Sequence, residues 1–443
     1  MIDLPNFVRI LYFLGTGLRR LRVNKEKLEE YQNKHLRAVV KHAYTSVPFY
    51  HDKFRKAGIL PDDIRNMGDL EKLPVTTKDE LRKADLSMTI SDEHNVENLK
   101  PQRTSGSTGK PFKFYISSVE DDWRRAIYLR ANISCGQRPL DKWVFVTAPL
   151  NFINISRIQR SLGFYAPLCI SVFGEPKEQV RMVSENKPDV LDGYSGALLL
   201  LAREMRRSGR SNIHPQRIFG SADMIDLPSR KYLEDTFNAP YHDQFGCSEV
   251  QRTAWQCPKR NGYHMDVDSV ITQFVDSEGN QVSTGTNGEI VQTSLFNFAM
   301  PFIRYSTGDI GRASADECSC GRTLPLMEVV EGRRDSFIVL PDGSMLSPRA
   351  FTVAMSMFKD YEELEQFRIV QKKPDYFDVS VVLKANYFDR DKLENNLESH
   401  LLKVLNMSSE DFTFDVKVVE KISLGESGKL MAVSSEVSPE RTS

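Results

Sequence analysis

The alternation of strand-like and helical segments in the middle of the chain constrains its fold more than any other feature. Runs rich in β-branched and aromatic residues predict short strands at residues 142–147, 189–194 and 217–222. Segments with helical character stand around these strands, at residues 122–132, 178–185 and 198–208. The alternation predicts an α/β layered domain, in which ligands lie beyond the carboxyl ends of the strands.

The segment before this region is expected to be a mostly helical scaffold over residues 1–100. Apolar residues recur at helical spacing from Leu28 to Ala43, and Pro48 ends that helix. A second helix is expected after Thr77, because Thr77 and Glu80 have the spacing of a capping box.

A change of pattern near Arg333 predicts a domain boundary there. Beyond it, strand-like runs and one helical stripe of leucines predict a small α+β domain, at residues 367–370, 379–383, 393–404 and 412–418. A chain of 443 residues is also longer than one hydrophobic core usually organises, which is roughly 250–300 residues. We therefore expect a large domain over 1–332 and a small one over 333–443.

The loop from Arg103 to Pro111 has the composition of a phosphate-binding loop. It offers three hydroxyls, two glycines and Lys110, so backbone N–H groups, hydroxyls and a positive charge can surround an anion. It is not a Walker A loop, because Thr104 and Pro111 stand where that motif has glycine and Ser/Thr. Residues 112–116 read as a strand, so the loop is expected between two strands. A plain polar hairpin turn is the alternative.

Two further Gly-containing segments carry acidic residues. Phe245–Glu249 follows a predicted strand over 241–244, and a hydroxyl beside a carboxylate can hold a phosphate oxygen and its Mg²⁺. Arg304–Asp309 places an aspartate after a tight glycine turn, where it can accept hydrogen bonds from a ribose diol. The alternative for each segment is an ordinary Gly-containing turn.

Three cysteines and one histidine have the character of zinc ligands. Cys257 and His264 are separated by six residues, and Cys318 and Cys320 by one. Three thiolates and one imidazole suit tetrahedral Zn²⁺, and four protein ligands would make the zinc structural. The alternative is a set of thiols with a histidine that hydrogen-bonds elsewhere.

Composition excludes some classes of function. The net charge is −1 and basic residues form no block, so nucleic acid is not an expected partner. The apolar run from Phe7 to Leu18 contains Arg9 and is shorter than the roughly 18 residues of a spanning helix. It also lacks a cleavage site of small residues, so we expect a cytoplasmic protein without a membrane span. We further expect a monomer or a homodimer.

Taken together and in order, five segments resemble the core motifs of the adenylate-forming superfamily of acyl-CoA synthetases, nonribosomal adenylation domains and luciferases. They are Thr104–Lys110, Phe245–Glu249, Tyr305–Asp309, Gly332–Asp335 and Ser427–Lys429. The resemblance covers roughly residues 30–435. Three more segments resemble the phenylacetate–CoA ligase branch and its relatives in capsular polysaccharide gene clusters. These are His42–Tyr50, Leu73–Lys78 and Cys318–Arg322.

The resemblance implies a role for each matching residue. The loop residues would hold the ATP β- and γ-phosphates: Thr104, Ser105, Gly106, Ser107, Thr108, Gly109 and Lys110. A second group would flank the adenine or line the nucleotide site: Gly220, Ser221, Ala222, Asp223, Phe245 and Gly246. Ser248 would contact the α-phosphate and Glu249 would bind Mg²⁺, while Asp309 and Arg333 would bind ribose hydroxyls. Asp335 would be a hinge for a mobile small domain, and Lys429 would bridge ATP and the carboxylate.

The implied activity is ATP- and Mg²⁺-dependent activation of a carboxylic acid as an acyl-adenylate, followed by transfer to coenzyme A. Two departures from the family pattern leave the acceptor open: Pro341-Asp342-Gly343 after the hinge, and Leu424-Gly425 before Lys429. A non-CoA acceptor, such as a sugar amine in surface polysaccharide assembly, is one alternative. A catalytically silent nucleotide-binding relative is another. The identity of the acid does not follow from the sequence, because pocket walls come from dispersed positions.

Overall fold

The computed structural model describes most of the chain in two compact units. The described residues are 6–103, 112–153, 155, 157–172, 174, 176–209, 212–222, 224–225, 227–331, 338–341, 345–346, 350–351, 354–355, 357–383, 390–405, 407–422 and 432–437. One unit comprises residues 1–138 and 242–330, and the other comprises 139–241 and 331–443. The boundary expected near Arg333 stays a prediction, and each unit is described separately.

Helices dominate the first hundred residues of the first unit. They are α1 (Asn6–Arg20), α2 (Lys25–Ser46), α3 (Pro48–Lys56), η1 (Pro61–Asp63), η2 (Met67–Lys72), α4 (Lys78–Lys83), α5 (Leu86–Thr89) and η3 (Val96–Asn98). The helix expected over Leu28–Ala43 is confirmed as α2, which ends where Pro48 disfavours helical backbone at Val47. The capping box of Thr77 and Glu80 is confirmed at the start of α4. None of the described helices combines the length and apolarity that a membrane crossing requires.

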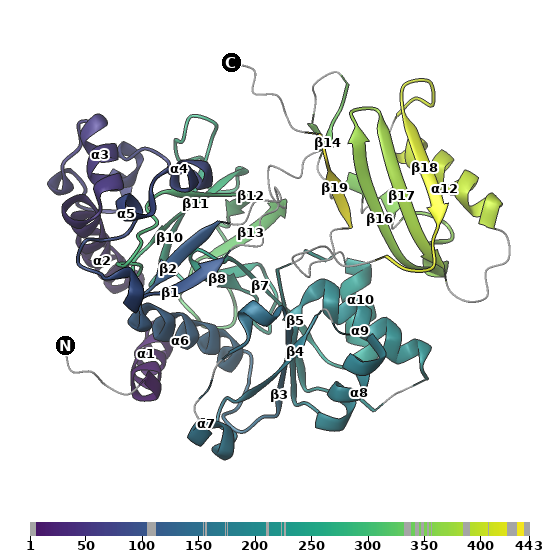
Figure 1. Ribbon diagram of the computed structural model, residues 1–443, viewed down its shortest axis with the longest axis horizontal. Coiled ribbons are helices and arrows are strands. Elements are labelled where there is room, and N and C mark those ends of the chain that lie inside the picture. The colour runs from purple at the N-terminus through teal and green to yellow at the C-terminus, as the bar shows by residue number, and fades with distance from the viewer. Residues whose placement is uncertain are drawn as a thin grey trace. The chain divides into compact units, whose positions relative to one another are not determined.

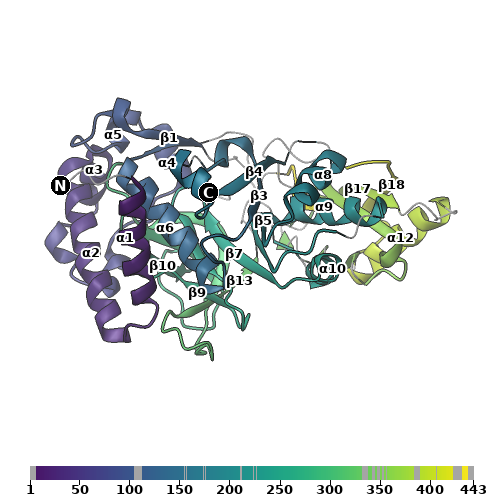
Figure 2. The ribbon, with the colours of Figure 1, turned by 90° about the horizontal axis from the view of Figure 1, so that it is seen from below.

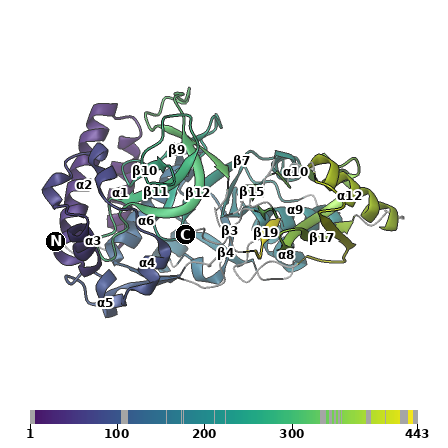
Figure 3. The same cartoon turned by 90° about the horizontal axis from the view of Figure 1, so that it is seen from above.

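A mostly antiparallel sheet forms the rest of this unit, together with helix α6 (Ser118–Ser134). Its strands are β7 (Tyr241–Cys247), β8 (Gln251–Trp255), β9 (Tyr263–Met265), β10 (Val270–Val275), β11 (Gly288–Ser294), β12 (Tyr305–Ala313) and β13 (Leu326–Glu331). They lie in the order β10-β11-β12-β13-β9-β8-β7. Leu36 and Val40 of α2 pack with Ile271 of β10, so the scaffold helices cover this end of the sheet (Figure 3). Figure 2 shows α1 and α6 side by side.

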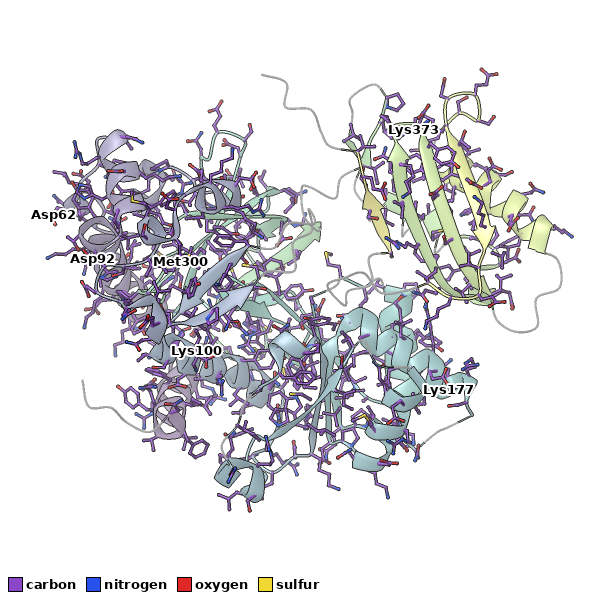
Figure 4. The ribbon with its side chains drawn as sticks, in the orientation of Figure 1. Asp62, Asp92, Lys100, Lys177, Met300 and Lys373 are labelled. Carbon is purple, nitrogen blue, oxygen red and sulfur yellow. The ribbon has the colours of Figure 1, made fainter. Side chains whose placement is uncertain are left out.

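The loop with the composition of a phosphate-binding loop connects the two strands of a β-hairpin. Strands β1 (Lys100–Arg103) and β2 (Lys113–Ile116) pair antiparallel, with Arg103 opposite Lys113. The prediction that this loop lies between two strands is therefore confirmed, while residues 104–111 themselves lie outside the described residues. Lys100, labelled in Figure 4, opens β1, and its Nζ lies 2.6 Å from a carboxylate oxygen of Asp121 in α6. This ion pair connects the hairpin to that helix.

Buried charges connect the helices of the first unit to its sheet. The Arg130 guanidinium of α6 lies 2.6 Å from Asp266 and 2.7 Å from Asp268, in the turn between β9 and β10. Arg20 of α1 also pairs with Asp268, at 2.6 Å, and Trp255 Nε1 donates to Asp266 at 2.9 Å. Burial opposes the charge of Asp268, but Arg130 and Arg20 outweigh it and hold the pKa of that carboxyl below its usual value.

A parallel sheet with flanking helices opens the second unit (Figure 1). Strands β3 (Trp143–Thr147), β4 (Pro167–Ser171), β5 (Val190–Tyr194) and β6 (Arg217–Ser221) are parallel neighbours in the order β6-β5-β3-β4. The accompanying helices are η4 (Pro149–Asn151), α7 (Arg157–Leu162), α8 (Pro176–Asn186), α9 (Ser195–Arg207) and α10 (Leu227–Phe237). The α/β class is confirmed. Strand β4 was not predicted, because this half-buried strand begins with a proline and lacks a strong apolar pattern.

The C-terminal segment forms a smaller α+β domain, as predicted. Strands β16 (Leu364–Lys373), β17 (Tyr376–Leu383), β18 (Thr413–Val418) and β19 (Val433–Ser435) lie in the order β18-β17-β16-β19. Helix α12 (Arg390–Val404) buries its leucine stripe with the stacked rings of Phe377 and Phe414. Strands β14 (Ile338–Val339) and β15 (Met345–Leu346) form a hairpin, and η6 (Tyr361–Glu363) precedes β16. Strand β19, only three residues long, was not predicted.

We predict that the buried charges around Arg130 stabilise the first unit. Arg130→Met would leave Asp266 and Asp268 buried without their main countercharge, and should cost about 3–5 kcal/mol in the free energy of unfolding, measured by denaturant titration. Arg181→Met is the control, because Arg181 forms its ion pairs at the surface and its loss should leave stability unchanged. Equal stability of both variants would contradict the prediction.

Candidate functional site

The first group of predicted site residues lies at the end of β7. The strand runs three residues further than expected, so Phe245 and Gly246 belong to it rather than to a following turn. A bulge in the β7–β8 pairing at this point explains the difference. Gly246 is required there, because a Cβ would lie 2.2 Å from the carbonyl oxygen of Gln251. The close approach of the two backbones fixes the direction in which Ser248 and Glu249 leave the strand.

Two side chains hold the backbone around Ser248 and Glu249. The Arg124 guanidinium of α6 donates to both carbonyl oxygens, at 2.9 Å for Ser248. Asn297 Nδ2 donates to the Glu249 carbonyl at 3.2 Å. Burial lowers the pKa of Arg124, partly offset by the nearby acidic groups. The segment is therefore fixed before any ligand binds, as a preorganised site requires.

The Glu249 carboxylate is buried, with only 2% of the side chain exposed. Its Oε1 accepts a hydrogen bond from the Tyr305 hydroxyl at 2.6 Å and lies 3.0 Å from Lys78 Nζ. Burial opposes the charge, but Lys78 and the hydrogen bond from Tyr305 outweigh it, so the pKa of Glu249 lies below its ordinary value. The site therefore holds an ionised oxygen ligand at neutral pH.

No role was predicted for Lys78 or Tyr305. Both residues lie in segments that the sequence marks, Leu73–Lys78 by its resemblance to a branch of the superfamily and Arg304–Asp309 by its aspartate. The local sequence does not show that the two segments pair, and this pairing brings both side chains to Glu249.

Cys247 lies beside these charges but is not suited to act as a nucleophile. Burial, and then the negative charge of Glu249, raise the pKa of its thiol far above the ordinary value. The thiolate is the nucleophilic form of cysteine. Cys247 is therefore better described as a residue that lines the site than as a nucleophile.

Asp309 lies within strand β12, not after a tight turn as the sequence predicted. The pairing of β11 with β12 shifts its register around Gly308, which has a φ of +76°. Glycine adopts this left-handed conformation without strain, so the strand continues through a bulge. The Asp309 backbone N–H donates a hydrogen bond to Thr307 Oγ1 at 3.2 Å. Tyr305 and Asp309 therefore belong to one strand, and the hydroxyl of Tyr305 donates to Glu249.

The segment Gly220–Ala222 lies in the second unit, at the end of β6. A Cβ at Gly220 would lie 1.9 Å from the Tyr241 hydroxyl oxygen, so only glycine fits there. The same hydroxyl lies 2.7 Å from Ser195 Oγ, which donates to the Ser221 carbonyl at 3.2 Å. Ala222 has a φ of +71°, a conformation that bends the backbone away from the strand.

The four predicted zinc ligands converge in the first unit. Cys257, His264, Cys318 and Cys320 place one ligand atom each within 4.8 Å of one another. The Sγ atoms of Cys257 and Cys318 lie 3.6 Å apart, and Cys320 Sγ lies 3.3 Å from His264 Nε2. Zn–S distances of about 2.3 Å in a tetrahedron put the sulfurs about 3.8 Å apart, so the donors fit zinc.

The histidine of this cluster is oriented for metal binding. His264 Nδ1 lies 3.2 Å from the Leu324 carbonyl, which leaves Nε2 toward the cysteines. Burial lowers the pKa of His264, which favours the neutral imidazole that a metal requires. For Cys320, burial opposes the thiolate, but hydrogen bonds from Arg322 outweigh it and the pKa lies below the ordinary value.

Several predicted site residues lie outside the described residues. They are Thr104, Ser105, Gly106, Ser107, Thr108, Gly109, Lys110, Asp223, Arg333, Asp335 and Lys429. Among the described residues, the structure brings together the end of β7, the start of β12 and the start of α4.

The sequence is similar to curated proteins with two different names. No family model matches the sequence. Phenylacetate-coenzyme A ligase of Escherichia coli (strain K12) is 28% identical over 326 residues, which cover 71% of this chain and 73% of that protein. Protein CapK of Staphylococcus aureus is 25% identical over 313 residues, or 66% of this chain and 64% of that protein.

Solved structures share the fold. The crystal structure of 2-hydroxyisobutyryl-CoA ligase in the postadenylation state, in complex with 2-HIB-AMP, has a TM-score of 0.78 and 19% identity. The alignment covers 94% of this chain and 91% of that chain. At this identity the likeness concerns the fold, which spans almost the whole chain.

Proposed function

We propose that the chain belongs to the adenylate-forming superfamily, in its phenylacetate–CoA ligase-like branch, and that it is an AMP-forming carboxylate–CoA ligase. It would activate a carboxylic acid with ATP and then transfer the acyl group to coenzyme A. The observation that carries this proposal is the sequence similarity to proteins named phenylacetate-coenzyme A ligase, over 71–81% of the chain.

The geometry around Glu249 supports the proposal. An ionised carboxylate oxygen is a preferred ligand of Mg²⁺, and Glu249 is held as such by Lys78 and Tyr305. Glu249 would therefore hold the Mg²⁺ that accompanies ATP, and Ser248 beside it would contact the α-phosphate. When bound, Mg²⁺ would withdraw charge from the phosphate oxygens.

The remaining roles follow the resemblance. The loop between β1 and β2 would hold the β- and γ-phosphates. Gly220, Ser221, Ala222 and Asp223 would flank the adenine, with Phe245 and Gly246 lining the nucleotide site. Asp309 and Arg333 would bind the ribose hydroxyls, Asp335 would be the hinge, and Lys429 would contact the reacting oxygens.

The proposed reaction has two steps. A carboxylate oxygen of the substrate attacks the α-phosphorus of ATP, the bond from that phosphorus to the bridging oxygen breaks, and pyrophosphate leaves. The coenzyme A thiol, on losing its proton, then attacks the carbonyl carbon of the acyl-adenylate, and AMP leaves. The protein must neutralise two negatively charged reactants and align them, and Lys110 and Lys429 would contribute the positive charges for this.

A non-CoA acceptor in surface polysaccharide assembly is the second candidate. The similarity to Protein CapK and the departures at Pro341-Asp342-Gly343 and Leu424-Gly425 are the observations in its favour. The larger number of relatives named CoA ligases favours coenzyme A.

Pyrophosphate release across a panel of carboxylic and amino acids, with and without coenzyme A, tests the function. We expect release that depends on the acid, and a thioester product when coenzyme A is present. Glu249→Gln should slow release by about 10²-fold or more, with an increased Mg²⁺ requirement, because a main electrostatic group is lost. Acid-dependent release without a thioester would indicate another acceptor, and no release with any acid would contradict the activity.

We also propose that Cys257, His264, Cys318 and Cys320 bind one structural zinc ion. Four protein ligands leave no open coordination position, and Cys257 and Cys318 are buried. The site joins the β8–β9 connection to the segment before β13. Zinc there would stabilise the fold rather than take part in the reaction.

Purified protein should therefore contain about one zinc per chain, as measured by elemental analysis. Cys320→Ser should remove the metal and lower the melting temperature, because binding of a structural metal contributes to folding. Cys135→Ser is the control, since Cys135 is a buried thiol outside the cluster and its loss should leave the zinc content unchanged. Protein prepared without chelator that contains no zinc would contradict the assignment.

Lys429 should act in only one of the two steps. Lys429→Ala is expected to slow acyl-adenylate formation on the order of 10²–10³-fold, the effect of losing a main electrostatic stabiliser. Supplied with ready-made acyl-adenylate, the same variant should transfer the acyl group at a near wild-type rate. Asp335→Pro should show the reverse pattern, because a fixed hinge stops the small domain from turning. Equal loss in both steps for Lys429→Ala would contradict two arrangements of the small domain.

A further inference from the structure

The segment Leu73–Lys78 enters the proposed function only through the ion pair of Lys78 with Glu249, and the structure fixes the whole segment against strand β12. Thr76 N donates to the Arg304 carbonyl at 2.8 Å, and Ser306 N donates to the Thr76 carbonyl at 2.9 Å. These bonds form a parallel bridge between Thr76 and Tyr305. Lys78 follows two residues later as the first residue of α4, so its position relative to Tyr305 is set by backbone pairing.

Side chains hold the same segment from both sides. Arg304 Nη1 donates to the Leu73 carbonyl at 2.5 Å, and Lys53 Nζ donates to the Val75 carbonyl at 2.9 Å. The capping box at Thr77 then fixes the direction of α4. Ordering a lysine side chain costs conformational entropy. Because the backbone at Lys78 is already fixed, the ion pair with Glu249 has to order only the side chain.

The two side chains that hold the Glu249 carboxylate lie at the same oxygen, and the Glu249 backbone N–H also donates a hydrogen bond to this carboxylate. Lys78 Nζ and the Tyr305 hydroxyl lie 3.0 Å and 2.6 Å from Oε1. Within the described part of the chain, no other side chain donates a hydrogen bond to this carboxylate or forms an ion pair with it. A carboxylate held through one oxygen presents the other in a fixed direction.

We propose that Lys78 is a positioning residue for the divalent cation: with Tyr305 it holds Oε1 of Glu249, so that Oε2 is the oxygen offered to the metal. The inference rests on the proposed function, which assigns Glu249 to Mg²⁺. Lys78 also supplies the positive charge that a buried carboxylate needs while no metal is bound. With 26% of its side chain exposed, Lys78 lies at the edge of the site rather than in the core.

A purely structural ion pair is the competing explanation, and metal binding separates the two. The experiment measures Mn²⁺ binding by electron paramagnetic resonance, in the presence of a non-cleavable ATP analogue, for the full-length protein. Four variants are compared with the wild type: Lys78→Met, Lys78→Arg, Tyr305→Phe and Lys72→Met. Lys72 is the matched control, because it pairs with Asp69 at the surface and does not contact Glu249.

We expect Lys78→Met to weaken Mn²⁺ binding by roughly 10–100-fold, the usual effect of removing a group that orients a metal ligand. Lys78→Arg should restore most of the affinity, Tyr305→Phe should weaken it, and Lys72→Met should leave it unchanged. The KM for the carboxylic acid should not change in Lys78→Met. Circular dichroism and melting temperature check that each variant is folded, and Tyr305→Phe provides the test if Lys78→Met is not.

Wild-type or tighter Mn²⁺ affinity in folded Lys78→Met would overturn the inference, and so would a wild-type protein that binds no Mn²⁺. If Mn²⁺ binding depends on Lys78 but no acid supports pyrophosphate release, the proposed function fails while the inference stands.

Discussion

A carboxylate buried to 2% exposure is the constraint around which the candidate site is built. An isolated buried charge is unstable, so the chain must bring a cation and a hydrogen-bond donor to Glu249. It does so with Lys78 from the helical scaffold and Tyr305 from β12, while Arg124 and Asn297 hold the Glu249 backbone. Residues from helices α4 and α6, from strand β12 and from the β11–β12 connection therefore meet at one residue.

A second group of buried charges in the same unit, around Arg130, contributes to stability rather than to a candidate ligand site. Asp266 and Asp268 are fully buried, and each of their four carboxylate oxygens contacts an arginine: Arg130 and Arg252 for Asp266, Arg130 and Arg20 for Asp268. Among the described residues, the two side chains that hold the Glu249 carboxylate, Lys78 and Tyr305, both contact one of its oxygens. The difference between a structural charge cluster and a candidate ligand site lies in this unequal distribution of partners.

Local sequence signals predicted most of the elements that depend on local physics. The leucine stripe of α12, the end of α2 before Pro48 and the capping box of α4 follow from periodicity and capping, and the structure confirms them. The prediction of a turn before Asp309 was wrong. Gly308 has a positive φ, which suits a β-bulge as well as a turn, and strand β12 continues through it. Strands β4 and β19, which are short, and strands β8 to β13 of the first unit were not predicted, because their pairing depends on neighbours far away in the sequence.

The sequence by itself determined the α/β class, the order of the motifs and the residue types of the candidate ligands. Composition, periodicity and spacing contain these facts, since each depends on neighbours along the chain. Only the tertiary structure decided that Cys257 and His264 meet Cys318 and Cys320, and that Lys78 and Tyr305 meet Glu249. Such contacts join positions more than fifty residues apart, and strand order and backbone pairing, which no local pattern encodes, bring them together.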